Sequence, residues 1–99
     1  PKQYQLLLAI KALSKDKQAS LGVLAEQLHM RHHSTLELIN RAEAKRLVER
    51  KRSGNYVVVR LTPTGEKILA RAVQRRLKEL RMAAPILVKA LQKLIAVRE

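Results

Sequence analysis

The chain has no cysteine, phenylalanine or tryptophan among its 99 residues, and only two tyrosines. Without cysteine it can form neither disulfide bonds nor thiolate metal sites, which agrees with a cytoplasmic location. Without large aromatic side chains, its core must consist of Leu, Ile, Val and Ala, a composition typical of packed helices. The length suits one domain. No apolar run approaches the roughly 18 residues that span a bilayer, so we expect no transmembrane segment.

Acidic residues are also scarce. Eight Asp and Glu stand against 21 Lys and Arg, which gives a formal net charge of +13 and an isoelectric point near 11.0. A small soluble domain usually carries a net charge of about 2 to 8. The excess favours a polyanionic partner, and nucleic acid is the first candidate.

Signals for enzymatic or metal chemistry are weak. The three glycines form no loop that could cradle a phosphate. His29 and His33 would suit two metal ligands on a continuous helix, but a predicted turn at Met30 and Arg31 separates them, and no Asp or Cys completes a set. The neighbours His33 and Ser34 would point apart on a helix, and a third orienting residue is not evident. We therefore predict no catalytic residue, no metal site and no cofactor.

Hydrophobic periodicity predicts three short helices in the first half of the chain. They cover Gln3–Ser14, Leu21–Leu28 and about His32–Lys45, and Ser20 is the expected N-cap of the second. The pattern then changes to a period of two. The runs LVERKR (47–52) and NYVVVRL (55–61), separated by Ser53 and Gly54, predict a β-hairpin.

Two helices are predicted to follow the hairpin. Thr62 and Pro63 are suited to the start of a helix that runs to about Met82. Pro85 should end or kink that helix, and Ile86–Val97 forms a last, very apolar helix. The predicted fold is therefore mainly α: a winged helix-turn-helix with a two-stranded wing and two C-terminal dimerisation helices. Residues 1–62 would form the DNA-binding lobe, and residues 63–99 the dimerisation segment.

This arrangement suits double-stranded DNA, because a recognition helix fits the major groove while a basic hairpin reaches the backbone or minor groove. Asn40 has the side chain for an adenine edge, and Leu36 could touch a thymine methyl. Glu37 could accept from a cytosine amino group or repel the DNA backbone, and the sequence does not decide between these roles. The expected DNA-binding residues are Arg31, His32, His33, Ser34, Leu36, Glu37, Asn40 and Arg41 on the third helix, and Arg50, Lys51, Arg52 and Asn55 on the wing.

Two segments resemble the MarR-type transcriptional regulators. LAEQLHMRHHSTLELINRAEAKRLVER (24–50) is similar to the family's helix-turn-helix without a gap. VVVRLTPTGEKIL (57–69) is similar to its second wing strand and the start of the next helix. The resemblance implies a homodimer that binds pseudo-palindromic operator DNA, often as a repressor that a small ligand releases.

The sequence departs from the family pattern in three ways. Arg46 stands where the family usually has Gly in a tight helix-to-strand turn, so that turn must adopt a less favourable or different geometry. The wing tip has only SGN in place of the family's Asp-x-Arg. No segment matches the family's leading dimerisation helix, which leaves dimerisation to the two C-terminal helices.

The apolar surface after residue 64 is the expected dimer contact, because a helix apolar over most of its circumference needs burial on several sides. The alternative is a basic amphipathic segment on a membrane surface, since Arg71, Arg75, Arg76, Lys78 and Arg81 lie close by. The predicted dimer residues are Leu69, Val73, Leu77, Leu80, Ile86, Leu87, Leu91, Leu94 and Ile95.

Two functions remain open at this point. The first is a sequence-specific, dimeric DNA-binding regulator. The second is a winged-helix protein-interaction module or a non-specific nucleic-acid binder, in which the charge promotes association without base readout. Competition with random DNA would separate them, because only a regulator keeps a large advantage for one sequence.

Overall fold

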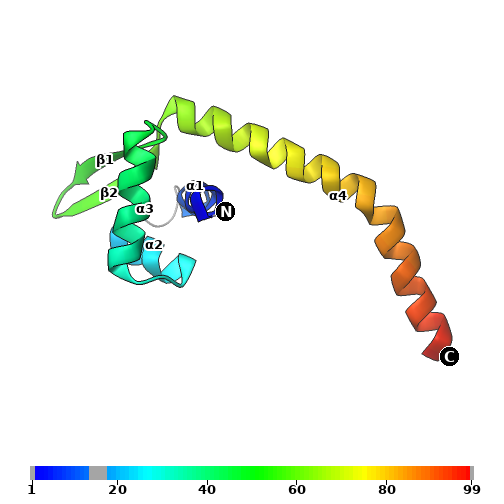
Figure 1. The fold of residues 1–99 in the computed structure, drawn as a ribbon. Helices are drawn as coiled ribbons and strands as arrows, with labels where there is room; N and C mark the ends of the chain where they lie inside the picture. The colour runs from blue at the N-terminus through cyan, green and yellow to red at the C-terminus, as the bar shows by residue number, and fades with distance from the viewer. Residues whose placement is uncertain (1, 14–17, 99) are drawn as a thin grey trace.

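In residues 2–13 and 18–98, which the computed structural model describes, the chain forms four helices and one two-stranded antiparallel sheet. The first three helices and the hairpin pack together, and the last helix leaves them as a long arm (Figure 1). The elements are α1 (Lys2–Leu13), α2 (Leu21–Leu28), α3 (His32–Ala44), β1 (Val48–Ser53), β2 (Tyr56–Leu61) and α4 (Pro63–Arg98). The predicted order is thus confirmed up to α4, and Ser14, the predicted last residue of the first helix, lies outside the described residues.

Local capping sets the bounds of α2. The hydroxyl of Ser20 accepts a hydrogen bond from the Val23 backbone N–H at 3.3 Å, as the capping pattern predicts. At the other end His29 is left-handed, with φ 53°, and Met30 donates its N–H to the Ala25 carbonyl at 2.9 Å. A left-handed residue ends the helix there. His29 and the following α3 are therefore on separate elements, as predicted.

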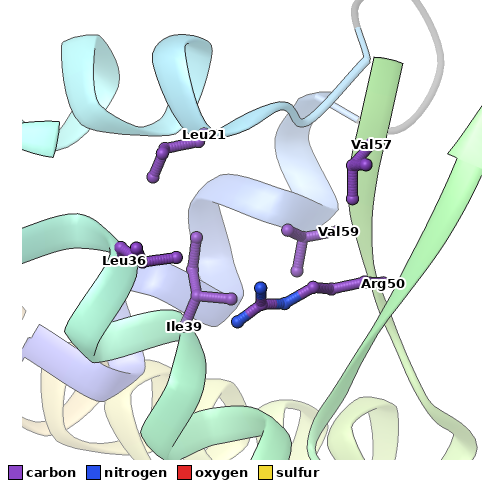
Figure 2. Close-up of a pocket in the computed structure, with 6 residues that line it drawn as sticks. All are labelled: Leu21, Leu36, Ile39, Arg50, Val57 and Val59. Carbon is purple, nitrogen blue, oxygen red and sulfur yellow. The ribbon is translucent and has the colours of Figure 1, made fainter. Parts of the chain in front are cut away.

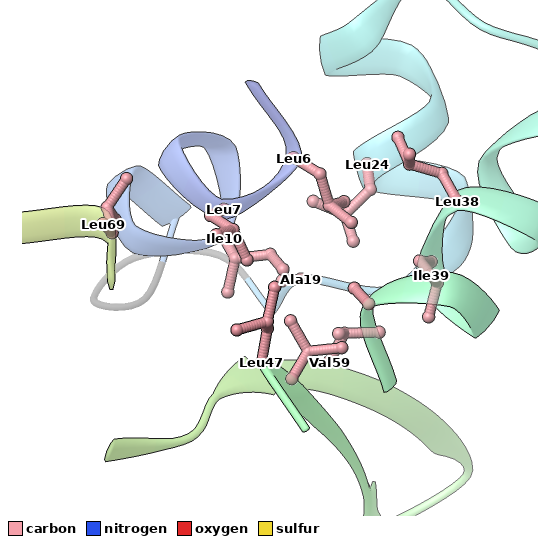
Figure 3. Packing of buried hydrophobic residues seen from close by; sticks show 12 residues of the cluster. Leu6, Leu7, Ile10, Ala19, Leu24, Leu38, Ile39, Leu47, Val59 and Leu69 are labelled. Carbon is pink, nitrogen blue, oxygen red and sulfur yellow. The ribbon is translucent and has the colours of Figure 1, made fainter. Parts of the chain in front are cut away.

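The core is aliphatic, as the lack of aromatics requires. It forms where α1, α2, α3, the hairpin and the first turns of α4 meet (Figure 3). Each fully buried Leu or Ile contributes about 1.5–3 kcal/mol relative to an exposed side chain. Among the described residues one polar side chain, Thr35, is also fully buried, and its hydroxyl donates to the Arg31 carbonyl at 2.9 Å. The cluster comprises Leu6, Leu7, Ile10, Ala19, Leu24, Leu38, Ile39, Ala42, Leu47, Val48, Val59 and Leu69.

The wing is a tight hairpin in which Ser53 pairs with Tyr56. Its two turn residues are Gly54 and Asn55, so the predicted separation by Ser53 and Gly54 was wrong by one residue. Gly54 has φ 64°, the positive value that the first turn position needs in a type II′ hairpin and that glycine adopts without strain. The turn aligns the two strands so that Arg50 lies opposite Val59.

The segment just before α2 pairs with the second wing strand. The sequence did not predict this pairing. Ser20 forms an isolated antiparallel bridge with Val58, and Val59 donates its N–H to the Ala19 carbonyl at 2.9 Å. The wing is therefore fastened to the start of the helix-turn-helix as well as to α3.

The turn from α3 to β1 has Arg46 where the family pattern would use glycine, and this turn contacts the start of α4. Arg46 is left-handed, with φ 60°, so this turn does adopt the less favourable conformation expected for a non-glycine residue. The Thr62 hydroxyl donates to the Arg46 carbonyl at 2.6 Å and caps α4 by accepting from the Gly65 N–H at 3.0 Å. A Cβ on Gly65 would lie 2.0 Å from the Leu47 carbonyl oxygen. Glycine is thus required at 65.

One continuous helix replaces the two that were predicted after the hairpin. α4 contains Pro85 in its interior, and it bends where its colour reaches orange (Figure 1). Proline removes one backbone hydrogen bond and displaces the carbonyl four residues earlier, which kinks a helix without ending it when strong helix formers continue on both sides. The kink half of the prediction is confirmed, and the helix break is wrong. No described helix is long and apolar enough to cross a membrane.

Candidate nucleic-acid interface

The exposed face of α3 presents the polar side chains that the sequence assigned to DNA. Thr35, Leu38, Ile39 and Ala42 point into the core, as predicted. This anchoring turns the opposite side outward over the whole length of the helix. Ser34 is half-buried, and the remaining predicted residues are exposed: Arg31, His32, His33, Leu36, Glu37, Asn40 and Arg41.

His33 and Glu37 form a pair on the outermost part of this face. Their Nε2 and Oε1 atoms are 3.2 Å apart at i and i+4, and 83% of the His33 side chain is exposed. Glu37 is an acidic residue on a face that we expect to bind an anion. Its contact with His33 gives it a partner on its own helix. Within the described residues no group of three or more His, Asp or Glu side chains could hold a metal ion.

Arg50 on the wing lies against α3 and does not project freely from the hairpin. Its Nη2 donates to Oδ1 of Asn40, and its Nε lies 3.4 Å from Oε1 of Glu43. About one third of its side chain is exposed (34%). The guanidinium of Arg50 is thus already engaged by two side chains of α3, and its contact with DNA stays a prediction.

A shallow apolar cavity of about 180 Å³ lies beside the Arg50 guanidinium. Figure 2 shows Leu36 and Ile39 of α3 on one side of it and Val57 and Val59 of β2 on the other. The cavity separates the recognition helix from the wing, and Arg50 reaches across it to Asn40. The contact thus joins two elements that pack only loosely at this point.

The other predicted wing residues are exposed. Lys51, Arg52 and Asn55 all face solvent, and in the described part of the chain neither Lys51 nor Arg52 has an acidic partner. Arg60, by contrast, donates its Nε to Glu49 at 2.8 Å across the hairpin. The unpaired charge of the wing is therefore concentrated near its tip.

The predicted dimerisation residues divide into two groups. Leu69 is only 4% exposed and belongs to the chain's own core, and Val73 packs against that core. Both sit on the part of α4 that α1 covers, where Lys11 pairs with Glu66 at 3.1 Å. The prediction that Leu69 contacts a partner chain was wrong. Val73 is partly buried against the core of its own chain. The others stay exposed: Leu77, Leu80, Ile86, Leu87, Leu91, Leu94 and Ile95.

The sequence missed the contacts that join the wing to the rest of the lobe. Gln18 donates to the Ser53 hydroxyl at 3.1 Å, and Ala19 and Ser20 pair with the second wing strand. The sequence also missed the contacts of Arg50 with Asn40 and Glu43. The one signal for these was a long cationic side chain on a strand that follows a helix with polar and acidic residues. Charge and spacing do not specify which residues on separate elements meet.

Solved structures share the fold of this chain. A MarR family protein from Bacillus stearothermophilus is 23% identical and has a TM-score of 0.72, with 99% of this chain covering 74% of that one. The transcriptional regulator BldR from Sulfolobus solfataricus is 25% identical, with a TM-score of 0.65 and coverages of 94% and 73%. A mutant of MepR from S. aureus bound to an oligodeoxyribonucleotide is 16% identical, with a TM-score of 0.74 and coverages of 99% and 78%.

No protein-family model matches the sequence, and no curated protein is similar enough to count as a match. The structural similarity extends over nearly the whole chain, α4 included. The chain therefore has the winged-helix fold of MarR-type regulators, with α3 in the place of the recognition helix and β1–β2 as the wing.

Proposed function

We propose that this chain is a sequence-specific DNA-binding transcriptional regulator, not an enzyme, and that it acts as a homodimer on a pseudo-palindromic operator. One observation carries the proposal: α3 turns a continuous polar face outward beside a wing with unpaired Lys51 and Arg52. The fold is shared with a protein whose solved structure contains an oligodeoxyribonucleotide. The net charge of +13 supplies the electrostatic attraction that DNA binding requires.

In this proposal the two elements have different tasks. The exposed face of α3 enters the major groove, where His33, Leu36 and Asn40 reach base edges and His32 and Ser34 reach phosphates. Arg31 and Arg41 extend the same face at its two ends. Lys51, Arg52 and Asn55 contact the backbone beside the groove. Sequence reading thus falls to α3, and the wing contributes mainly charge.

The homodimer follows from the apolar residues of α4 that the chain leaves uncovered. Large contiguous apolar patches on a protein surface mark association sites. Leu80, Leu87 and Leu91 are each more than half exposed, and we assign them to contacts with a second copy. Two recognition helices related by two-fold symmetry would read half-sites about one helical turn apart, which a single helix cannot do. Residues 1–62 with the first turns of α4 form the DNA-binding lobe, and the rest of residues 63–99 forms the dimerisation segment.

Repression and release by a small ligand complete the proposal, and both rest on the resemblance to MarR-type regulators. The cavity beside Arg50, at about 180 Å³, is smaller than the roughly 300–1,000 Å³ typical of small-molecule sites. An effector would therefore need the wing and α3 to separate, or would bind elsewhere on the dimer.

In vitro selection from a randomised duplex pool tests the function. A regulator should enrich one two-fold symmetric sequence and bind it at least about 10³-fold more tightly than random DNA at physiological salt. Enrichment of no sequence, with strong and salt-dependent binding of all duplexes, would identify a non-specific binder. No DNA binding at all would leave a protein-interaction module.

A further inference from the structure

The long helix α4 carries as much positive charge as the DNA-binding lobe. Between Pro63 and Arg98 it has nine Lys and Arg against two Glu, a formal +7 of the chain's +13. At about 3.6 residues per turn, seven of the nine fall within roughly one third of the helix circumference. We call this set the basic ridge: Lys67, Arg71, Arg75, Lys78, Arg81, Lys89 and Lys93.

The basic ridge is exposed and unneutralised. All seven side chains face solvent, and none of them has an acidic partner among the residues that the structure describes. Arg76, which lies off the ridge, is instead held 4.9 Å over the ring of Tyr4 on α1. The ridge therefore presents cations along about 39 Å of helix from Lys67 to Lys93 at about 1.5 Å per residue, with a gap between Arg81 and Lys89 that contains Pro85.

Most apolar residues of α4 lie on the side opposite the ridge, but at about 100° per residue the exposed Met82 falls within the arc of the ridge and Ile68 and Ile86 lie at its edge. Leu69 and Val73, on the apolar side, pack against the core. Pro85 follows Lys67 by about five full turns and so lies on the ridge side, and a helix bends away from its proline. Figure 1 agrees, because α1 lies on the inner side of the bend. The basic ridge thus forms the outer, convex side of the arm. A partner that covered the apolar side of α4 would leave the ridge exposed.

This geometry selects among polyanions. An amphipathic helix on a membrane buries its apolar face and carries Lys and Arg on its polar face. α4 has this distribution, but the dimer that we propose covers its apolar residues, which leaves the basic ridge without an apolar surface to insert into a membrane. Single-stranded nucleic acid is usually held by stacking on aromatic rings, and the chain's two aromatic residues, Tyr4 and Tyr56, lie outside α4. Binding to the regularly spaced phosphates of a double helix requires neither an inserted apolar face nor aromatic rings.

We propose that the basic ridge is a second nucleic-acid surface, separate from α3 and the wing, which binds the phosphate backbone of double-stranded DNA without reading its sequence. Lys and Arg side chains at helical spacing contact phosphates and release counterions, and this gives affinity without base preference. α4 extends away from α3 and the wing (Figure 1), so the ridge would hold flanking DNA or a second duplex. The inference goes beyond the proposed function and does not depend on an operator, but it rests on the proposed dimer to cover the apolar side of α4.

The test compares two double variants that each lower the net charge by two. The ridge pair is Arg71→Gln with Arg75→Gln, and the control pair is Lys2→Gln with Lys45→Gln, which lie outside both the ridge and the predicted interface. Gln keeps a high helix propensity, and circular dichroism checks that the fold is retained. Anisotropy of a labelled random 30-base-pair duplex, measured from 50 to 200 mM salt, gives the slope of log K against log salt.

The ridge pair should lower the magnitude of this slope by about two, because each substitution removes one cation from a phosphate, while the control pair leaves it near the wild-type value. Equal slopes for all three proteins, or an equal decrease for both pairs, would overturn the proposal. So would weaker binding of the ridge pair to phosphatidylserine vesicles with the DNA slope unchanged, because the occupant would then be a membrane. Selection from a random pool separates the two proposals: a ridge-dependent slope with no enriched sequence would refute only the proposed function, and an enriched sequence with an unaltered slope would refute only the ridge.

Discussion

Arg50 of the wing donates a hydrogen bond to the side-chain oxygen of Asn40 on the recognition helix. The same guanidinium lies 3.4 Å from the carboxylate of Glu43, one helical turn further along α3. The contact orients the Asn40 amide, because its oxygen is directed toward the wing and its NH₂ group is left as the end that faces away. If Asn40 reads a base as we propose, Arg50 positions its side chain and does not itself bind a phosphate.

Arg50→Gln should therefore reduce discrimination and leave the salt dependence almost unchanged. Without the guanidinium the Asn40 amide can rotate, which weakens a base contact made by its NH₂ group, and losing a base contact costs about 1–3 kcal/mol. The preference for the selected operator over random DNA should fall within that range. Binding titrations of both duplexes at several salt concentrations measure the two effects separately. A drop in the salt slope by about one would assign Arg50 to the phosphate backbone instead.

Arg52→Gln is the matched comparison, because residue 52 lies two positions along the same strand and is exposed without an acidic partner among the described residues. This change should weaken binding to operator and random DNA to a similar extent and lower the salt slope by about one. If the preferred base at any position changed instead, the wing would read sequence directly.

Asn40→Ala and His33→Ala test the recognition face itself. Each should lower the preference for operator over random DNA by about 1–3 kcal/mol if it removes a base contact. His33→Ala also deprives Glu37 of its neighbour at 3.2 Å and leaves a lone carboxylate near the DNA. Equally weakened binding of both duplexes would reduce these residues to backbone contacts, and unchanged binding of both would place them outside the interface.

Gly65→Ala should destabilise the lobe although it lies far from the proposed base contacts. The new Cβ would meet the Leu47 carbonyl oxygen at 2.0 Å, and overpacking of this kind typically costs about 1–3 kcal/mol. Urea unfolding followed by circular dichroism should show a lower midpoint with an unchanged slope. Gly22→Ala is the control, because its Cβ would meet only a His32 ring atom at 3.9 Å. Equal effects of the two substitutions would refute the close-packing argument.

Charge at the exposed end of α4 should separate the proposed dimer. Leu91 and Leu94 are 59% and 63% exposed in the single chain, so Leu91→Glu with Leu94→Glu should leave the lobe folded and give monomers. Operator affinity should then fall much more than affinity for random DNA, because two linked half-sites become one. Sedimentation of the unmodified chain at micromolar concentration is the direct measurement. A monomer of 11.3 kDa there would contradict the dimer.

The sequence by itself determined the local features of this protein. Ser20 and Thr62 mark helix starts, the helical periodicity of residues 32–44 defines which side of α3 is buried, and Gly54 marks the wing turn. These signals are readable because each depends on backbone geometry and hydrogen bonds within a few residues of the chain. The tertiary structure decided the rest. It placed Arg50 against Asn40, enclosed Leu69 in the chain's own core, joined Ala19 to Val59 and kept α4 continuous through Pro85. The first three are contacts between separate elements of the fold, and the last is a balance between a local break and the helix formers around it. In each case the outcome depends on how whole elements pack, which composition and spacing do not encode.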